Sequence, residues 1–168
     1  MQILSEKIWN KIKNTPFAIS ILINLIAVLM IFWLFEPTMK SDDYDMCNLL
    51  YGGVDGKYQS QLLYCSIIWG KILVALLNVF PNIAWYTVLQ YILIIGAVIF
   101  VDMILLEKQR NYTIPLFFLS LFLSYEFMIR FTFSKTAGIL MVAGYVILLN
   151  ALEQREEIVR VLWGFSFL

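Results

Sequence analysis

The chain has 168 residues, of which 61% are hydrophobic and only 14% are charged, and its mean hydropathy is +0.81. A soluble domain carries about a quarter of charged residues, so this composition excludes an ordinary soluble protein and indicates a helical membrane protein. Twelve basic residues balance twelve acidic ones, which leaves no basic field for nucleic acid, and the chain has no histidine for catalysis or metal binding.

Residues 1–16 predict a short amphipathic helix at the membrane surface, because apolar residues alternate there with Lys7, Lys11 and Lys13. Lysines that precede the first apolar run place the N-terminus in the cytoplasm. We therefore expect a multi-pass protein of the cell (plasma) membrane with a cytoplasmic N-terminus.

Five apolar runs approach or exceed the length of about 18 residues that is typical of a membrane span. They are residues 17–35, 62–80, 84–106, 112–129 and 137–152. A sixth apolar stretch, residues 161–168, is too short to cross, so it is expected to be the start of a span in a longer protein or a tail packed on the bundle. The expected fold is an all-α transmembrane bundle of about five spans plus an incomplete sixth.

The run at residues 62–80 has two readings, because Lys71 interrupts it. If every run crosses, five basic residues lie inside and six outside, which fits the excess of Lys and Arg in cytoplasmic loops poorly. If this run is re-entrant or half-spanning, seven lie inside and five outside. Its length of nineteen residues still makes a full crossing the first expectation.

Residues 36–61 form the longest polar connection, an acidic outer loop within a single transmembrane domain. Pro37 is expected to end the first span. Residues 42–51 predict a juxtamembrane helix that turns Met46, Leu49 and Leu50 towards lipid and ends at Gly52.

Asp42 and Asp43 are the candidate catalytic residues of this loop. Neighbouring carboxylates can share a divalent cation, and one of them could act as general base on an acceptor hydroxyl. The alternative is a solvated acidic loop that caps a helix. Tyr44 lies beside the pair, and its ring could stack on a sugar.

Charged residues inside the apolar runs are the other candidates, because burying a charge in a bilayer is costly. Lys71 could bind a lipid phosphate or extend to the interface. Glu126 and Arg130 are four residues apart and could form an ion pair, or Arg130 could form a phosphate site with Lys135.

Three further residues, Asp102, Cys47 and Cys65, are expected to have structural roles. Asp102 lies near the end of its run, where it could pair with Lys108. Cys47 and Cys65 do not have the spacing of a metal site or a redox pair, so they are expected to be idle thiols, or a disulfide in an oxidising compartment.

The order of first span, Asp-Asp-Tyr loop, juxtamembrane helix and apolar second run resembles the membrane-embedded glycosyltransferases of the GT-C superfamily. The resemblance rests on residues 36–44 (EPTMKSDDY) and 81–86 (PNIAWY). It implies a polyprenyl-phosphate-linked sugar as donor, a glycan or lipid of the cell envelope as acceptor, and Asp42 or Asp43 as the base. It also implies that the chain is the N-terminal portion of a module with more spans.

Two functions follow as expectations. One is transfer of a sugar from a lipid-phosphate donor at the outer face, with Tyr44, Lys71, Arg130 and Lys135 binding substrate and Mg²⁺ or Mn²⁺ held by Asp42 and Asp43. The other is a transporter or a non-catalytic membrane subunit, in which the intramembrane charges line a path and the loop aspartates have no special task.

Overall fold

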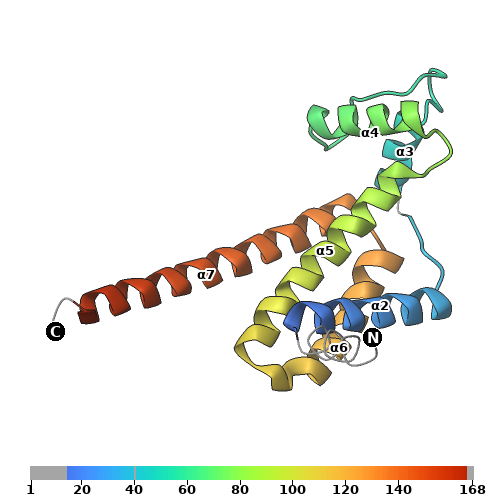
Figure 1. Ribbon diagram of the computed structural model, residues 1–168. Coiled ribbons are helices and arrows are strands. Elements are labelled where there is room, and N and C mark those ends of the chain that lie inside the picture. The colour runs from blue at the N-terminus through green and yellow to red at the C-terminus, as the bar shows by residue number, and fades with distance from the viewer. Residues whose placement is uncertain (1–14, 40, 166–168) are drawn as a thin grey trace, which may run out of the picture.

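The computed structural model describes residues 15–39 and 41–165, so nearly all of the surface helix expected at residues 1–16 lies outside the described residues. The described chain is 78% helical and has no strands. Its elements in chain order are α2 (Pro16–Leu34), α3 (Ser41–Leu50), α4 (Ile67–Val79), α5 (Trp85–Lys108), the short 3-10 helix η1 (Arg110–Tyr112), α6 (Thr113–Ser124), the π-helical η2 (Tyr125–Ile129) and α7 (Phe133–Phe165) (Figure 1).

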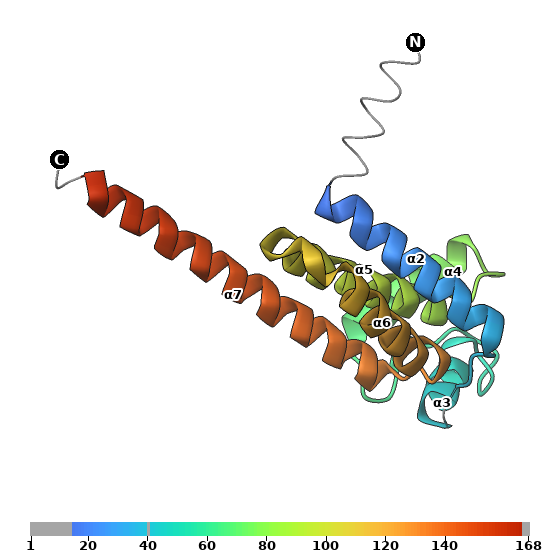
Figure 2. The same ribbon diagram turned by 90° about the horizontal axis from the view of Figure 1, so that it is seen from below.

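Helices α2, α5 and α6 pack against one another, and α7 packs along α5 before it extends away from the others (Figures 1 and 2). Helices α3 and α4 lie together beyond the end of the bundle where α5 begins. We call this end, with α3, α4 and the first turns of α5, the cap end. Side chains far apart in the sequence therefore meet there.

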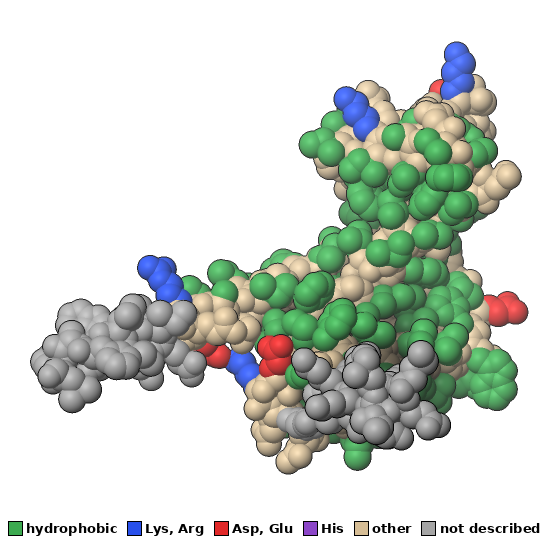
Figure 3. All heavy atoms as spheres, viewed as in Figure 1, with side chains coloured by type: hydrophobic (Ala, Val, Ile, Leu, Met, Phe, Trp, Pro, Cys, Tyr) green, Lys and Arg blue, Asp and Glu red, His purple; other side chains and the backbone are tan. Residues whose placement is uncertain are grey.

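Among the described residues, three helices are long and apolar enough to cross a membrane, namely α2, α5 and the Phe133–Arg155 part of α7. Hydrophobic side chains cover most of the face seen in Figure 3, and the charged side chains visible there lie towards the cap end and the far ends of the helices. The expectation of an all-helical fold is therefore confirmed for the described residues, and the long apolar helices are consistent with a membrane protein.

The apolar run at residues 62–80 forms a helix only from Ile67 to Val79. Thirteen helical residues rise about 20 Å, less than the roughly 30 Å of a bilayer core. Helix α4 packs on α3 and on α5, and a Cβ on Gly70 would lie 1.9 Å from the Ser60 carbonyl oxygen, so the preceding loop passes directly against it. Helix α4 is thus shorter than a full crossing requires, and the full-crossing and half-spanning readings of this run both remain expectations.

The buried side chains between α3, α4 and α5 define what we call the cap cluster. Its members are Met46, Leu50, Leu62, Leu73, Leu77, Tyr86 and Phe131. The prediction that Met46 and Leu50 face lipid was wrong, because both are fully buried against protein. The helix itself was placed well, since residues 42–51 were predicted and Ser41–Leu50 is observed.

The last two apolar runs also differ from expectation. The run at 112–129 is α6 continued by a π-helical turn, η2. Helix α7 runs without interruption through the charged segment after Leu152 to Phe165. Residues 161–165 therefore continue α7 and do not start a helix of their own, and the number of spans remains an expectation.

A buried polar network joins three helices of the bundle. Asp102 on α5 is fully buried and accepts hydrogen bonds at Oδ2 from Asn24 Nδ2 (2.7 Å) and Ser120 Oγ (3.0 Å). Ser20 Oγ donates to the Ile99 carbonyl at 2.8 Å. The predicted Asp102–Lys108 pair was wrong, because Lys108 forms an ion pair with Glu153 of α7. Asp102 instead ties α2, α5 and α6 together.

The arrangement predicts that the two ends of α5 lie on opposite sides of the membrane. Val54 and Gln109 are exposed in the connections before α4 and after α5. With Cys47 and Cys65 replaced by Ser, Val54→Cys should react with an impermeant thiol reagent in intact cells, and Gln109→Cys only after permeabilisation. The reverse pattern would invert the orientation, and labelling of both in intact cells would contradict a crossing by α5.

The native thiols are poor probes for this experiment. Both cysteines are free and half-buried, so the expected alternative of a disulfide is not formed. Burial, together with the nearby Asp43 carboxylate, raises the pKa of the Cys47 thiol to about 12. Since the thiolate is the reacting species, Cys47 should label slowly even where reagent reaches it.

Candidate functional site

Asp43 is a buried residue of α3 that forms hydrogen bonds to two other helices at the cap end. Its side chain is 1% exposed, and Oδ1 accepts hydrogen bonds from the Tyr86 hydroxyl (2.6 Å) and from the backbone N–H of Phe133 (3.0 Å). These bonds connect α3 to the first turn of α5 and the first residue of α7. A carboxylate held in this way is fixed and shielded from water, so Asp43 has a structural role in this arrangement.

Asp42 is exposed in the first turn of the same helix. Consecutive residues of a helix do not share a face, so the register that turns Asp43 into the protein turns Asp42 outwards. The partial positive charge at the N-terminus of α3 favours a carboxylate in this turn. Asp42 is therefore the accessible one of the two predicted catalytic residues.

The same geometry does not favour a cation shared by the two carboxylates. One oxygen of Asp43 is already bonded to two donors, and the two side chains lie on different faces of α3. Within the described residues, no group of three or more metal-binding side chains occurs. The Mg²⁺ or Mn²⁺ ion remains a prediction from sequence, and no step below depends on it.

Lys135 holds the turn between η2 and α7. Its Nζ donates to the Glu126 carbonyl (2.9 Å) and the Arg130 carbonyl (3.1 Å) and forms an ion pair with the Glu126 carboxylate. An ammonium group has three N–H donors, and these three acceptors match them. The structure thus pairs Glu126 with Lys135 in place of the predicted Arg130, and Lys135 has no donor to spare for a phosphate.

Other donors reach the carbonyl groups that the π-helical turn leaves without helical partners. Tyr91 of α5 donates its hydroxyl to the Met128 carbonyl at 2.9 Å, and the Thr38 N–H donates to the Ile129 carbonyl at 2.7 Å. Thr38 belongs to the segment that follows α2. The end of η2 is therefore tied to α5 and to the connection that leads into α3.

The remaining predicted site residues are exposed at the cap end or next to it. Tyr44 is 63% exposed on α3, Lys71 is exposed on α4, and Arg130 is exposed directly after η2. Helix α4, which carries Lys71, is shorter than the three helices of membrane-spanning length. Tyr44 and Asp42 lie on the same short helix, α3. Lys71 lies on the neighbouring helix α4, and Arg130 directly follows η2.

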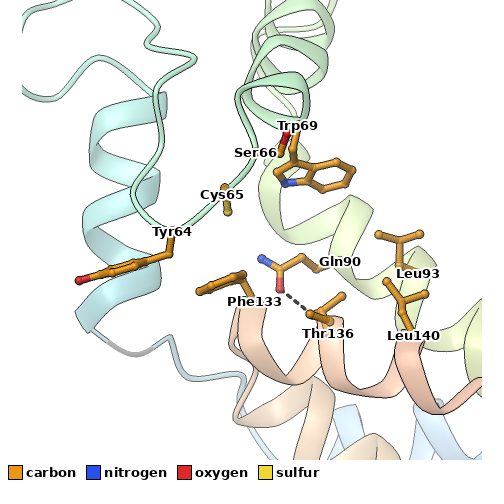
Figure 4. A pocket seen from close by; sticks show the side chains of 10 residues that line it. Tyr64, Cys65, Ser66, Trp69, Gln90, Leu93, Phe133, Thr136 and Leu140 are labelled. Carbon is orange, nitrogen blue, oxygen red and sulfur yellow. Dashed lines mark hydrogen bonds between the residues drawn. The ribbon is translucent and has the colours of Figure 1, made fainter.

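A cavity of about 350 Å³ opens beside these elements, between the start of α4, α5 and α7. Its lining, which we call the Gln90 pocket, consists of Tyr64, Cys65, Ser66, Trp69, Gln90, Leu93, Phe133, Thr136, Ala137 and Leu140 (Figure 4). Gln90 Oε1 accepts a hydrogen bond from Thr136 at 2.8 Å, and its Nε2 has no partner among the described residues. Cys65 contacts Met46 of α3, with 3.7 Å between the sulfur atoms.

Sequence reasoning missed Gln90, Tyr86 and Thr136. A signal was present, because Gln90 is a polar residue within an apolar run, and polar groups within a membrane helix are retained where they have a partner. The partners themselves, however, come from segments more than forty residues away in the sequence.

The described chain is thus a helical protein with apolar helices long enough to span a membrane, and its cap end combines exposed polar residues with a mostly apolar cavity. No family model, curated protein or solved structure matches the chain.

Proposed function

We propose that the protein acts as a membrane glycosyltransferase, moving a sugar from a lipid-phosphate donor to a cell-envelope acceptor at the outer face. The observation that supports it best is the contrast between the two loop aspartates. Asp43 fixes α3 against α5 and α7, and Asp42 is thereby presented to solvent from a rigid helix. A base held in a defined position is what such a reaction requires.

In the proposed reaction the acceptor hydroxyl attacks the anomeric carbon of the sugar. The bond from that carbon to the phosphate oxygen breaks, the lipid phosphate leaves with the bonding electrons, and Asp42 takes the hydroxyl proton. The departing phosphate gains negative charge, which Lys71 and Arg130 would balance as exposed cations near the same end. Tyr44, 63% exposed two residues from Asp42, would contact the sugar ring.

A direct transfer assay tests this proposal. Purified protein in liposomes would be given polyprenyl-phosphate sugars carrying a radioactive sugar, together with a panel of glycan and lipid acceptors. We expect label to move from the polyprenyl-phosphate fraction into an acceptor only when the protein is present. Label that stays on the donor for every combination would contradict the proposal.

The second candidate function is a transporter or a non-catalytic membrane subunit. The Asp102 network favours it, because a fully buried carboxyl group that joins three apolar helices, two of them of membrane-spanning length, is typical of ion and proton paths. Asp102 Oδ1 also has no hydrogen-bond partner among the described residues. An ion flux in the same liposomes that Asp102→Asn abolishes, without sugar transfer, would favour this candidate.

A further inference from the structure

The Gln90 pocket continues into a second hollow between α5 and α7. The two share Leu93 and Leu140, and the second has a volume of about 300 Å³. We call it the α5–α7 groove, and it is lined by Ile92, Leu93, Gly96, Ala97, Phe100, Leu140, Ala143, Gly144 and Ile147. The small residues on both helices keep the groove open, since a Cβ on Gly96 or Gly144 would meet nothing within 4 Å.

The two hollows together form a mostly apolar channel, and the polar side chains of its lining, Gln90 and Thr136 among them, lie in the Gln90 pocket. None of the lining residues of either hollow is charged. Gln90 is 2% exposed, its Nε2 lacks a partner among the described residues, and in Figure 4 this nitrogen is directed into the pocket. A buried N–H donor without a partner costs about 1–3 kcal/mol. A ligand that places an acceptor oxygen near this nitrogen would therefore be bound favourably.

The depth of Gln90 indicates which acceptor this is. Gln90 lies five residues into α5, which corresponds to about 8 Å along the helix from its start at Trp85. Tyr64 and Trp69 line the same pocket, and these residue types mark the membrane interface. We take these two aromatic residues to place the start of α5 at the membrane interface, and Gln90 would then lie near the level of the lipid ester groups.

We propose that this channel binds a membrane ester lipid, with one acyl chain in the α5–α7 groove and its ester carbonyl accepting a hydrogen bond from Gln90 Nε2. A phosphate would need a cation, and the lining has none. A helix of a partner protein would fill the groove but offers no free acceptor, because its carbonyl groups are bonded within the helix. The site is independent of the transfer reaction proposed above.

A comparison of two lipids tests the hydrogen bond. The purified protein in detergent would be titrated with a diester phosphatidylglycerol and with its diether analogue, which has the same chains and headgroup but no carbonyl, and binding read by native mass spectrometry. We expect the diester to bind about tenfold more tightly, as one hydrogen bond allows. Gln90→Leu should remove this preference. The substitution does not leave the Thr136 hydroxyl without an acceptor, because the Thr132 carbonyl lies 3.3 Å from it.

A second pair of variants tests the groove. Gly144→Leu would fill it and should reduce binding of both lipids at least tenfold. Gly138→Leu is the matched control, because Gly138 lies on the same helix with open space around it and lines neither hollow. Equal binding of diester and diether by the unaltered protein, or full binding by a folded Gly144→Leu variant, would overturn the proposal. So would disulfide-linked dimers of Gly144→Cys in membranes, which would place a second copy in the groove.

Discussion

Replacing Asp42 by Asn should lower the rate of sugar transfer by about 10²–10⁴-fold, the usual contribution of a general base. Asn has the size of Asp but cannot take the acceptor's proton. The matched control is Asp45→Asn, because Asp45 is also exposed on α3 and belongs to the same acidic helix. We expect this variant to keep a rate within a few-fold of the unaltered protein, measured in the liposome transfer assay.

The pair of variants separates chemistry from the general effect of negative charge. If Asp42 only contributed to an acidic surface, the two substitutions would lower the rate by similar amounts. Both residues are exposed, so both proteins should fold, with a loss in the free energy of unfolding of at most about 1 kcal/mol for Asp42→Asn, which removes a charge from the first turn of α3. Transfer at the full rate by Asp42→Asn would remove Asp42 as the base and leave the acidic helix as a solvated connector.

The long apolar helices could be predicted closely from the sequence. Residues 17–35 and 84–106 were expected, and Pro16–Leu34 and Trp85–Lys108 are observed. Uninterrupted apolar segments of this length satisfy their backbone only as helices in a bilayer, so composition alone fixes them. Residues 62–66 are as apolar as a span yet lie outside a helix, because Leu62 is buried in the cap cluster instead of in lipid.

The different environments of Asp42 and Asp43 could have been inferred from helical periodicity. Asp43, Met46 and Leu50 are at positions i, i+3 and i+7, which places all three on one face of α3. Because Met46 and Leu50 are the apolar residues of that face, Asp43 turns into the protein with them. Their contact with α4 and α5, which makes this face a buried one, could not be predicted, since it depends on how α3 and α4 pack together at the start of α5.

The η2 turn and the role of Lys135 were also beyond sequence reasoning. An ion pair four residues apart on a regular helix was the natural prediction for Glu126 and Arg130. The π-helical turn changes the register at Glu126, and the Glu126 and Arg130 carbonyl groups accept hydrogen bonds from the ammonium group of Lys135 on the next helix. Such turns have no clear sequence signature, and they occur often at functional sites.

Asp43→Ala should lower the free energy of unfolding by roughly 2–6 kcal/mol, because it leaves two buried donors, the Tyr86 hydroxyl and the Phe133 N–H, without an acceptor at about 1–3 kcal/mol each. Unfolding would be followed by denaturant titration in detergent. Asp45→Ala is the control, and its exposed position predicts a change within about 0.5 kcal/mol.

A double-mutant cycle with Tyr86→Phe shows whether the loss comes from this contact. Tyr86 is fully buried, and its hydroxyl lies 2.6 Å from Asp43 Oδ1. Residues in direct contact usually show a coupling of about 0.5–3 kcal/mol, so the double variant should be less destabilised than the sum of the single ones. Additive losses would mean that the two side chains do not interact, and α3 would then lack the anchor that presents Asp42 to solvent.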